Sequence, residues 1–104
     1  MTAQRGEVWL VDLGLAAKVR PALIASISYL DHERALYAIV PHTTALRNTR
    51  FEVSVEVPGL QTGAFDAQGL RPVPPVVLLR RISQLKPTQM AAVETAMRAW
   101  LGLR

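Results

Sequence analysis

The stretch Glu7-Val-Trp-Leu-Val-Asp-Leu13 alternates its side chains between two faces, and both faces are apolar near the middle. Val8 and Leu10 lie on one face, and Trp9 and Val11 lie on the other. A period of two over this length indicates a β-strand, and apolar residues on both sides indicate that the strand is covered on both sides. The fold therefore starts from a buried strand near the N-terminus.

Further strands are predicted outward from this one. Val19–Ile27 contains Pro21, which points to a sheet edge or a bulge because proline has no N–H to donate. Phe51–Val57 alternates cleanly and carries an acidic face, which is not expected to contact an anionic partner. The remaining predicted strands are Ala35–Thr43, a short one near Gly63–Phe65 and a buried one at Val76–Ile82.

One helix is predicted, over Pro87–Leu101, after a turn-rich connection that spans Pro58–Pro75. Proline suits the first helical turn, Gly102 suits the C-terminal cap, and Glu94 and Arg98 have the spacing of an ion pair. Apolar residues recur at helical spacing on one face, which predicts core packing; they are Met90, Val93, Met97, Trp100 and Leu101. The expected fold is mainly β with a C-terminal helix (α+β), with about five antiparallel strands closed or half-closed into a small barrel.

Composition indicates one ordered domain spanning residues 1–104, because half of the residues are hydrophobic and only 19% are charged. The absence of cysteine excludes disulfides, a cysteine nucleophile and a thiolate zinc site. Two histidines, His32 and His42, are too few for a transition-metal site, so no cofactor is expected. No segment resembles a membrane span or a signal peptide, and a cytoplasmic protein with no membrane partner is expected.

The charge favours an anionic partner. Lysine and arginine total 12 against 8 acidic residues, a formal charge of +4, and most of these cations are arginine. Arginine contacts phosphate through two parallel hydrogen bonds and stacks on bases, which lysine does not do.

The first candidate site segment is Lys18-Val-Arg-Pro21. Pro21 biases Arg20 toward an extended backbone, so the guanidinium begins a strand with a set direction. A guanidinium on a rigid element stabilises charge that builds up on a phosphate. The alternative interpretation is an ordinary exposed arginine.

The second candidate segment is Val40-Pro-His-Thr-Thr44, where a strand ends in two hydroxyls. Thr43 and Thr44 suit hydrogen bonds to a phosphate oxygen or a 2'-hydroxyl, or else a turn that caps the loop. His42 has the ordinary pKa of a general base, about 6.5, or else it is a strand-end histidine with no proton to move.

Two further basic segments complete the candidates. Arg47-Asn-Thr-Arg50 directly follows the threonines and suits a sugar-phosphate backbone or, equally, a solvated loop. Arg80 and Arg81 point to opposite faces of a strand, and one of them is expected to pair with a carboxylate.

The order of segments resembles the MazF/PemK toxins of bacterial toxin–antitoxin systems. The resemblance covers nearly the whole chain and lies in the order of the segments rather than in any one motif. The segments that carry it are Arg5-Gly-Glu-Val-Trp-Leu-Val-Asp-Leu-Gly14, Lys18-Val-Arg-Pro-Ala-Leu-Ile-Ala-Ser26, Ile39-Val-Pro-His-Thr-Thr44, Phe51-Glu-Val53, Val76-Val-Leu-Leu79 and a closing helix before Leu101-Gly-Leu103.

The resemblance implies an SH3-like antiparallel barrel of the MazF/CcdB type that forms a homodimer. It implies a sequence-specific, metal-independent endoribonuclease (mRNA interferase) that cuts single-stranded RNA, leaving 2',3'-cyclic phosphate and 5'-hydroxyl ends. Arg20 and Thr44 match the family's catalytic residues. The flanking nucleotides would contact Lys18, His42, Thr43, Arg47 and Arg50, and an antitoxin with an acidic tail would occupy the same groove.

The resemblance leaves the general base unassigned. Many relatives carry a glutamate in the loop that here is Gly14–Lys18, and some carry an aspartate near the last strand, but this chain has neither. His42 is the remaining candidate. Two alternatives stay open: a CcdB-like gyrase poison that acts through Trp100 and Gly102, and an inactive RNA-binding barrel. The position of Trp100 on the apolar stripe argues against the first.

Overall fold

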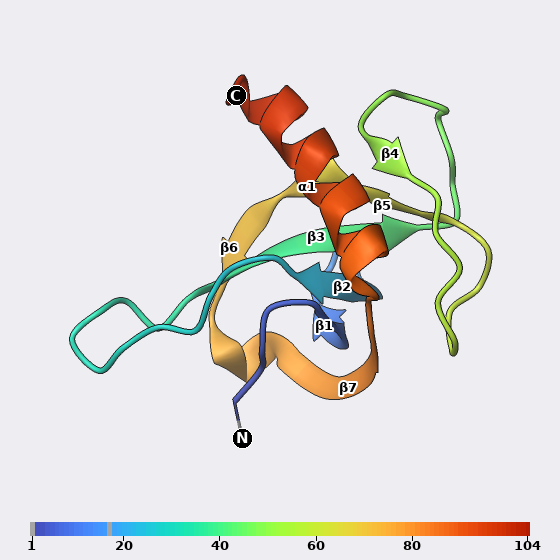
Figure 1. The fold of residues 1–104 in the computed structure, drawn as a ribbon. Coiled ribbons are helices and arrows are strands. Elements are labelled where there is room, and N and C mark those ends of the chain that lie inside the picture. The colour runs from blue at the N-terminus through green and yellow to red at the C-terminus, as the bar shows by residue number, and fades with distance from the viewer. Residues whose placement is uncertain (1, 17) are drawn as a thin grey trace.

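A computed structural model of the chain describes residues 2–16 and 18–104. Within these residues, seven strands, two short 3₁₀ helices and one α-helix follow one another (Figure 1). Their bounds are β1 Glu7–Asp12, β2 Val19–Ile24, β3 Tyr37–Thr43, β4 Glu52–Val53, β5 Ala64–Asp66, η1 Ala67–Gly69, β6 Arg71–Val73, η2 Pro75–Val77, β7 Leu78–Gln84 and α1 Pro87–Leu101.

The strands form one antiparallel sheet that stays open. The order is β4-β5-β3-β2-β1-β7, and β6 pairs with the other half of β3. Among the described strands, the end strands β4 and β7 do not pair with each other. Figure 1 shows the sheet bent around its core, with α1 lying across one side. The predicted mainly β fold with a C-terminal helix is confirmed, and the barrel is half-closed rather than closed.

The apolar faces of β1 enter two separate cores, as its alternation predicts. Val8 packs with Leu23 and Phe65 under the helix, whereas Trp9 and Val11 pack on the opposite side of the sheet. Full burial of a side chain of this size contributes roughly 1.5–3 kcal/mol. β1 therefore contributes side chains to both halves of the core.

The helix begins and ends where its local signals predict. Pro87 occupies the first turn, and Gly102 adopts a left-handed conformation (φ 70°) at the C-terminal cap. Met90, Val93 and Ala96 are buried.

Two predictions about the helix surface are wrong. Trp100 and Leu101 are 44% and 50% exposed, because the helix extends past the sheet at this end. Glu94 forms its ion pair with Arg5 rather than with Arg98, because the N-terminal segment lies within reach of its carboxylate.

Several predicted strands differ from the observed ones. The strand expected at Phe51–Val57 has only two residues in the ladder, because β5 pairs with β4 at Glu52 and Val53 alone. The strand expected to be buried at Val76–Ile82 is the partly exposed end strand β7, which among the described strands pairs only with β1. The connection Pro58–Pro75 contains β5, η1 and β6 rather than one short strand.

Pro21 lies in a central strand, not at a sheet edge. β2 pairs with both β1 and β3, but its ladder with β3 begins only at Ala22. The missing N–H of the proline therefore falls beyond the end of that ladder. No helix within residues 2–16 and 18–104 is long and apolar enough to cross a membrane.

Candidate active site

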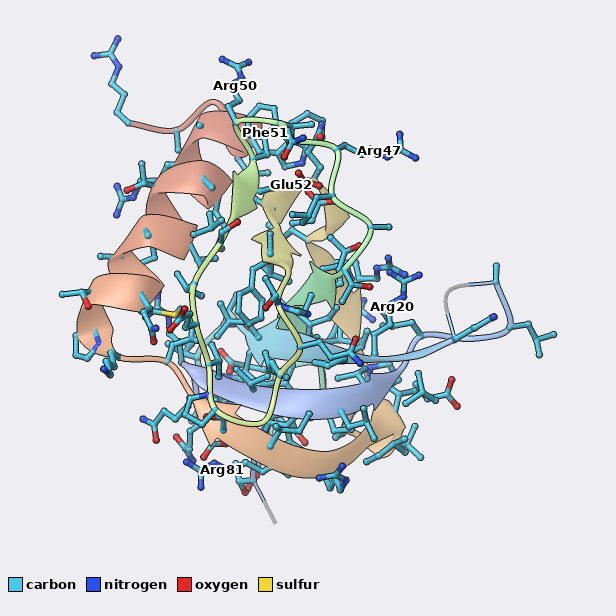
Figure 2. All side chains as sticks on the ribbon, turned by 90° about the vertical axis from the view of Figure 1, so that its right-hand side faces the viewer. Arg20, Arg47, Arg50, Phe51, Glu52 and Arg81 are labelled. Atoms are coloured by element: carbon cyan, nitrogen blue, oxygen red, sulfur yellow. The ribbon has the colours of Figure 1, made fainter. Side chains whose placement is uncertain are left out.

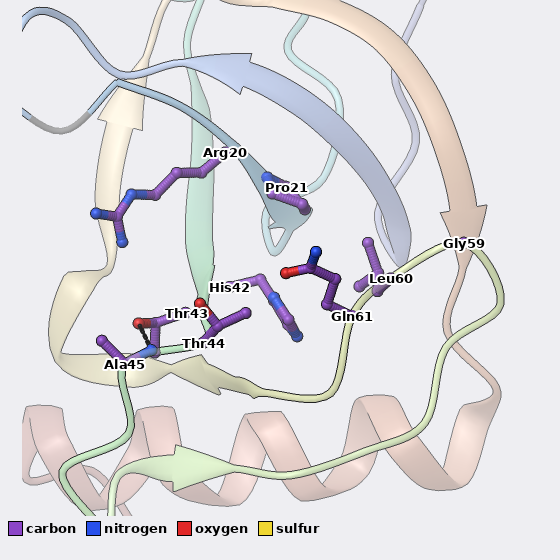
Figure 3. A pocket seen from close by; sticks show the side chains of 9 residues that line it. All are labelled: Arg20, Pro21, His42, Thr43, Thr44, Ala45, Gly59, Leu60 and Gln61. Atoms are coloured by element: carbon purple, nitrogen blue, oxygen red, sulfur yellow. Dashed lines mark hydrogen bonds between the residues drawn. The ribbon is translucent and has the colours of Figure 1, made fainter.

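Pairing of β2 with β3 brings the two principal candidate segments together. Ala22 lies opposite Pro41, so the start of β2 and the end of β3 are neighbours in the sheet. A pocket of about 330 Å³ opens at this point (Figure 3). It is lined by Arg20, Pro21, His42, Thr43, Thr44, Ala45, Gly59, Leu60 and Gln61.

Arg20 supplies the only charge among the residues that line the pocket. Its side chain is exposed, and Figure 3 shows the guanidinium extended along one wall. The turn before it is closed by two hydrogen bonds: the Leu13 N–H donates to the Lys18 carbonyl oxygen at 2.9 Å, and the Lys18 N–H donates to the Gly14 carbonyl oxygen at 2.6 Å. A cation on a strand start held in this way suits an anionic ligand.

The two threonines have different surroundings. The Thr43 hydroxyl accepts a hydrogen bond from the Ala45 N–H at 3.0 Å, which is the turn predicted as its alternative role. Thr44 is exposed in the pocket wall (Figure 3). Thr44 is therefore the hydroxyl that faces an incoming ligand, and Thr43 shapes the end of the strand.

His42 is buried near the end of β3. It is 4% exposed, and its ring lies edge to face with Phe65, with ring centroids 5.1 Å apart. Its Nε2 is buried without a hydrogen-bond partner. Burial lowers the pKa of the imidazole below its ordinary value, because desolvation disfavours the charged form.

Part of the pocket lining comes from the segment Pro58–Pro75, which was predicted to be a turn-rich connection. A turn with Gly59 at φ +89°, closed by the Leu60 N–H donating to the Val57 carbonyl oxygen at 3.1 Å, places Leu60 and Gln61 beside the pocket. The proline and glycine content of this segment predicts turns, but it does not predict which part of the protein the turns contact.

The basic loop after the pocket has a defined backbone. The Glu52 carboxylate accepts hydrogen bonds from the Arg47 and Thr49 N–H groups, at 3.1 and 3.3 Å. Figure 2 shows the Arg47 side chain projecting into solvent, whereas Arg50 lies over the Phe51 ring, 4.6 Å from its centroid. The acidic residue of β4 thus supports the loop.

Three basic candidates lie outside the pocket: Lys18, Arg47 and Arg50. Arg81, in contrast, is paired as predicted, because its Nε lies 3.1 Å from Glu7 Oε2. Within residues 2–16 and 18–104, no group of three or more histidine, aspartate or glutamate side chains could hold a metal ion.

The pocket presents one guanidinium, an exposed threonine hydroxyl and a buried imidazole. This set of side chains suits an anionic ligand. A family model of the PemK-like, MazF-like toxins of type II toxin–antitoxin systems matches residues 4–101. The chain belongs to this toxin family.

Solved structures with the same fold include two mycobacterial proteins. An endoribonuclease from a mycobacterial species, solved with its cognate antitoxin, is 26% identical with a TM-score of 0.84, covering 99% of this chain and 98% of that one. The Mycobacterium tuberculosis toxin MazF-mt6 is 25% identical with a TM-score of 0.80, covering 94% and 98%. A MazE–MazF structure from Deinococcus radiodurans, 18% identical with a TM-score of 0.82 over 100% and 99% of the chains, shares the fold.

Proposed function

We propose that this protein is a sequence-specific, metal-independent endoribonuclease toxin that cleaves single-stranded RNA and is neutralised by a cognate antitoxin. The observation that carries the proposal is the meeting of Arg20, at the start of β2, and Thr44, directly after β3, in one pocket. The likeness to a mycobacterial endoribonuclease solved with its antitoxin supports it.

The chemistry follows from the two side chains. The 2'-hydroxyl of the scissile nucleotide attacks the adjacent phosphorus, and the 5'-oxygen leaves, producing a 2',3'-cyclic phosphate and a 5'-hydroxyl. Negative charge builds up on the non-bridging oxygens during this step, and the Arg20 guanidinium neutralises it. The Thr44 hydroxyl orients the phosphate or the attacking hydroxyl by a hydrogen bond.

Flanking nucleotides would contact the residues around the pocket. Thr43 and His42 line it, and Arg47 and Arg50 would contact phosphates along the loop that Glu52 supports. Lys18 lies on the turn that precedes Arg20 and would add a further phosphate contact. Such contacts give affinity that falls as salt rises, because binding releases counterions from the RNA.

The same positive surface suits an antitoxin with an acidic tail, since both ligands are anionic. We also propose that the protein is a homodimer in the cytoplasm, and light scattering of the purified protein tests the dimer. A mass of one chain, where the monomer is 11.4 kDa, would contradict it.

The function is tested by incubating purified protein with a long single-stranded RNA in EDTA and mapping the new 5' ends. Discrete cuts with 5'-hydroxyl ends at one short sequence are expected. Intact RNA across several substrates would overturn the proposal. A DNA supercoiling assay with gyrase would then test the alternative of a gyrase poison. Trp100 is exposed, so its predicted burial is no longer an argument against that alternative.

A further inference from the structure

His42 is an unusual residue for the core of a small protein. Among residues 2–16 and 18–104 it is the only buried polar or charged residue. Its Nε2 is also the only buried side-chain nitrogen or oxygen in that part of the chain without a hydrogen-bond partner. Buried polar groups are nearly always paired, because an unpaired one costs stability. Such a group in a pocket wall calls for a functional explanation.

The surroundings of the ring hold it neutral. Phe65 covers it edge to face at an interplanar angle of 71°, and Leu60 lies on the same pocket wall. None of the residues that line this pocket is acidic, so no carboxylate there favours the charged imidazolium. The lowered pKa of His42 agrees with this geometry. At neutral pH one ring nitrogen therefore carries a lone pair.

The proposed cleavage requires a group that removes the proton of the 2'-hydroxyl. Guanidinium groups stay protonated in proteins, and hydroxyl and amide groups do not accept protons near neutral pH. These are the other polar side chains of the pocket, namely Arg20, Thr43, Thr44 and Gln61. By chemistry, His42 is the one lining residue that can act as a base.

Gly63 lies close to the His42 ring. A Cβ built on Gly63 would lie 2.7 Å from His42 Cε1 and 3.1 Å from Nε2, so the Gly63 backbone lies directly on the ring. Figure 3 shows the imidazole pointing away from Arg20 and toward the segment that follows Gln61. The close approach of this segment accounts for the burial of Nε2.

We infer that His42 is the general base of the cleavage reaction, and that the segment Gln61–Gly63 uncovers Nε2 when RNA binds. The inference rests on the proposed function. Nε2 takes the proton of the 2'-hydroxyl while the 2'-oxygen bonds to phosphorus and the P–O5' bond breaks. The departing 5'-oxygen takes a proton from water, and the imidazolium later returns its own proton to solvent. The number of protons is therefore unchanged over one cycle.

The test compares single-turnover cleavage between pH 5 and 8.5 for the wild-type protein, His42→Gln and His32→Gln. His32 is the matched control, because it is the other histidine and lies exposed in a turn. The wild-type rate should rise with pH at the acidic end. His42→Gln should be slower by about 100-fold at pH 7 and lose that rise, as expected when a general base is removed. His32→Gln should keep both the rate and the pH profile.

A second measurement uses the wild-type fold and separates the two proposals. NMR of the ¹⁵N-histidine protein is recorded with a saturating RNA whose scissile nucleotide lacks the 2'-hydroxyl. The His42 ring resonances should respond and those of His32 should not. A folded His42→Gln that cuts at the wild-type rate with the wild-type pH profile, or a His42 ring that RNA leaves unchanged, would overturn the inference alone. Wild-type protein that leaves RNA intact would overturn it together with the proposed function.

Discussion

Gly63 lies directly against the His42 imidazole. It immediately precedes β5, the strand that pairs with the end of β3. A side chain on Gly63 would also come within 2.3 Å of the Thr43 carbonyl oxygen. The end of β3, the buried ring and the segment over the pocket therefore fit together only when position 63 has no side chain.

Gly63→Ala should lower the free energy of unfolding by about 1–3 kcal/mol, the usual cost of overpacking a closely packed site. Urea unfolding followed by circular dichroism measures it. Thr62→Ala is the matched control, because Thr62 is exposed and its truncation fills no space. Equal stability of Gly63→Ala and the wild-type protein would show that the contact is not tight in solution.

The stability of the protein should fall as the pH drops below about 6.5. Burial lowers the pKa of His42 in the folded state, so the unfolded chain binds its proton first. The stabilising effect is fully present above the unfolded pKa of about 6.5 and is lost as the pH falls toward the folded pKa. The slope from one group is at most about 1.4 kcal/mol per pH unit.

Urea unfolding at pH 7.5, 6.5 and 5.5 measures this dependence. His32→Gln should keep it and His42→Gln should reduce it, since only His42 is buried. If His42→Gln and wild-type protein lose the same stability between pH 7.5 and 5.5, another group is responsible.

Arg20→Ala should reduce the cleavage rate by about 10²–10³-fold and leave the fold intact. The loss corresponds to removal of one preorganised charge stabiliser, and the exposed side chain contributes little to the core. Arg20→Lys should recover only part of the rate, because an ammonium does not reproduce the two parallel hydrogen bonds of a guanidinium. Single-turnover kinetics with a mapped RNA measures both variants. A folded Arg20→Ala at the wild-type rate would remove this residue from the mechanism.

Thr44→Val should slow cleavage by about tenfold, because it keeps the shape of the side chain and loses one neutral hydrogen bond. Thr44→Ser keeps the hydroxyl and should stay close to the wild-type rate. The same single-turnover assay distinguishes them. Identical rates for the valine and serine variants would mean that the hydroxyl does not act in the reaction.

Chelation should leave cleavage unchanged. The proposed step uses side chains alone, and the part of the chain that the structure describes offers no cluster of three metal-ligating groups. The measurement compares the rate after dialysis against EDTA with the rate in added magnesium. Activity that disappears on chelation and returns with magnesium would contradict the prediction.

The helix and the first strand were predictable because their signals are local. Pro87 and Gly102 mark the two ends of α1 within one turn of its boundaries, and the alternation in Glu7–Asp12 indicated burial on both faces. Trp100 shows the limit of this reasoning. Its helical spacing matched the apolar stripe, but its exposure depends on how far the helix extends past the sheet.

The pocket was predictable in part. Arg20 was predictable because Pro21 biases its backbone toward an extended conformation, and Thr44 because it places a hydroxyl at the end of a strand. The short ladder of Glu52–Val53 was not predictable, because an alternating pattern does not show whether a partner strand is long enough to pair with it.

The amino-acid sequence by itself determined the strand-rich chain, its closing helix and the arginine and threonine that meet in the pocket. Only the tertiary structure decided that His42 is buried against Phe65, that Gly63 covers its Nε2 and that Leu60 and Gln61 complete the pocket. The reason is physical. Side-chain periodicity and turn propensity act over a few neighbouring residues, whereas burial and pocket walls depend on the register between strands that lie far apart in the chain.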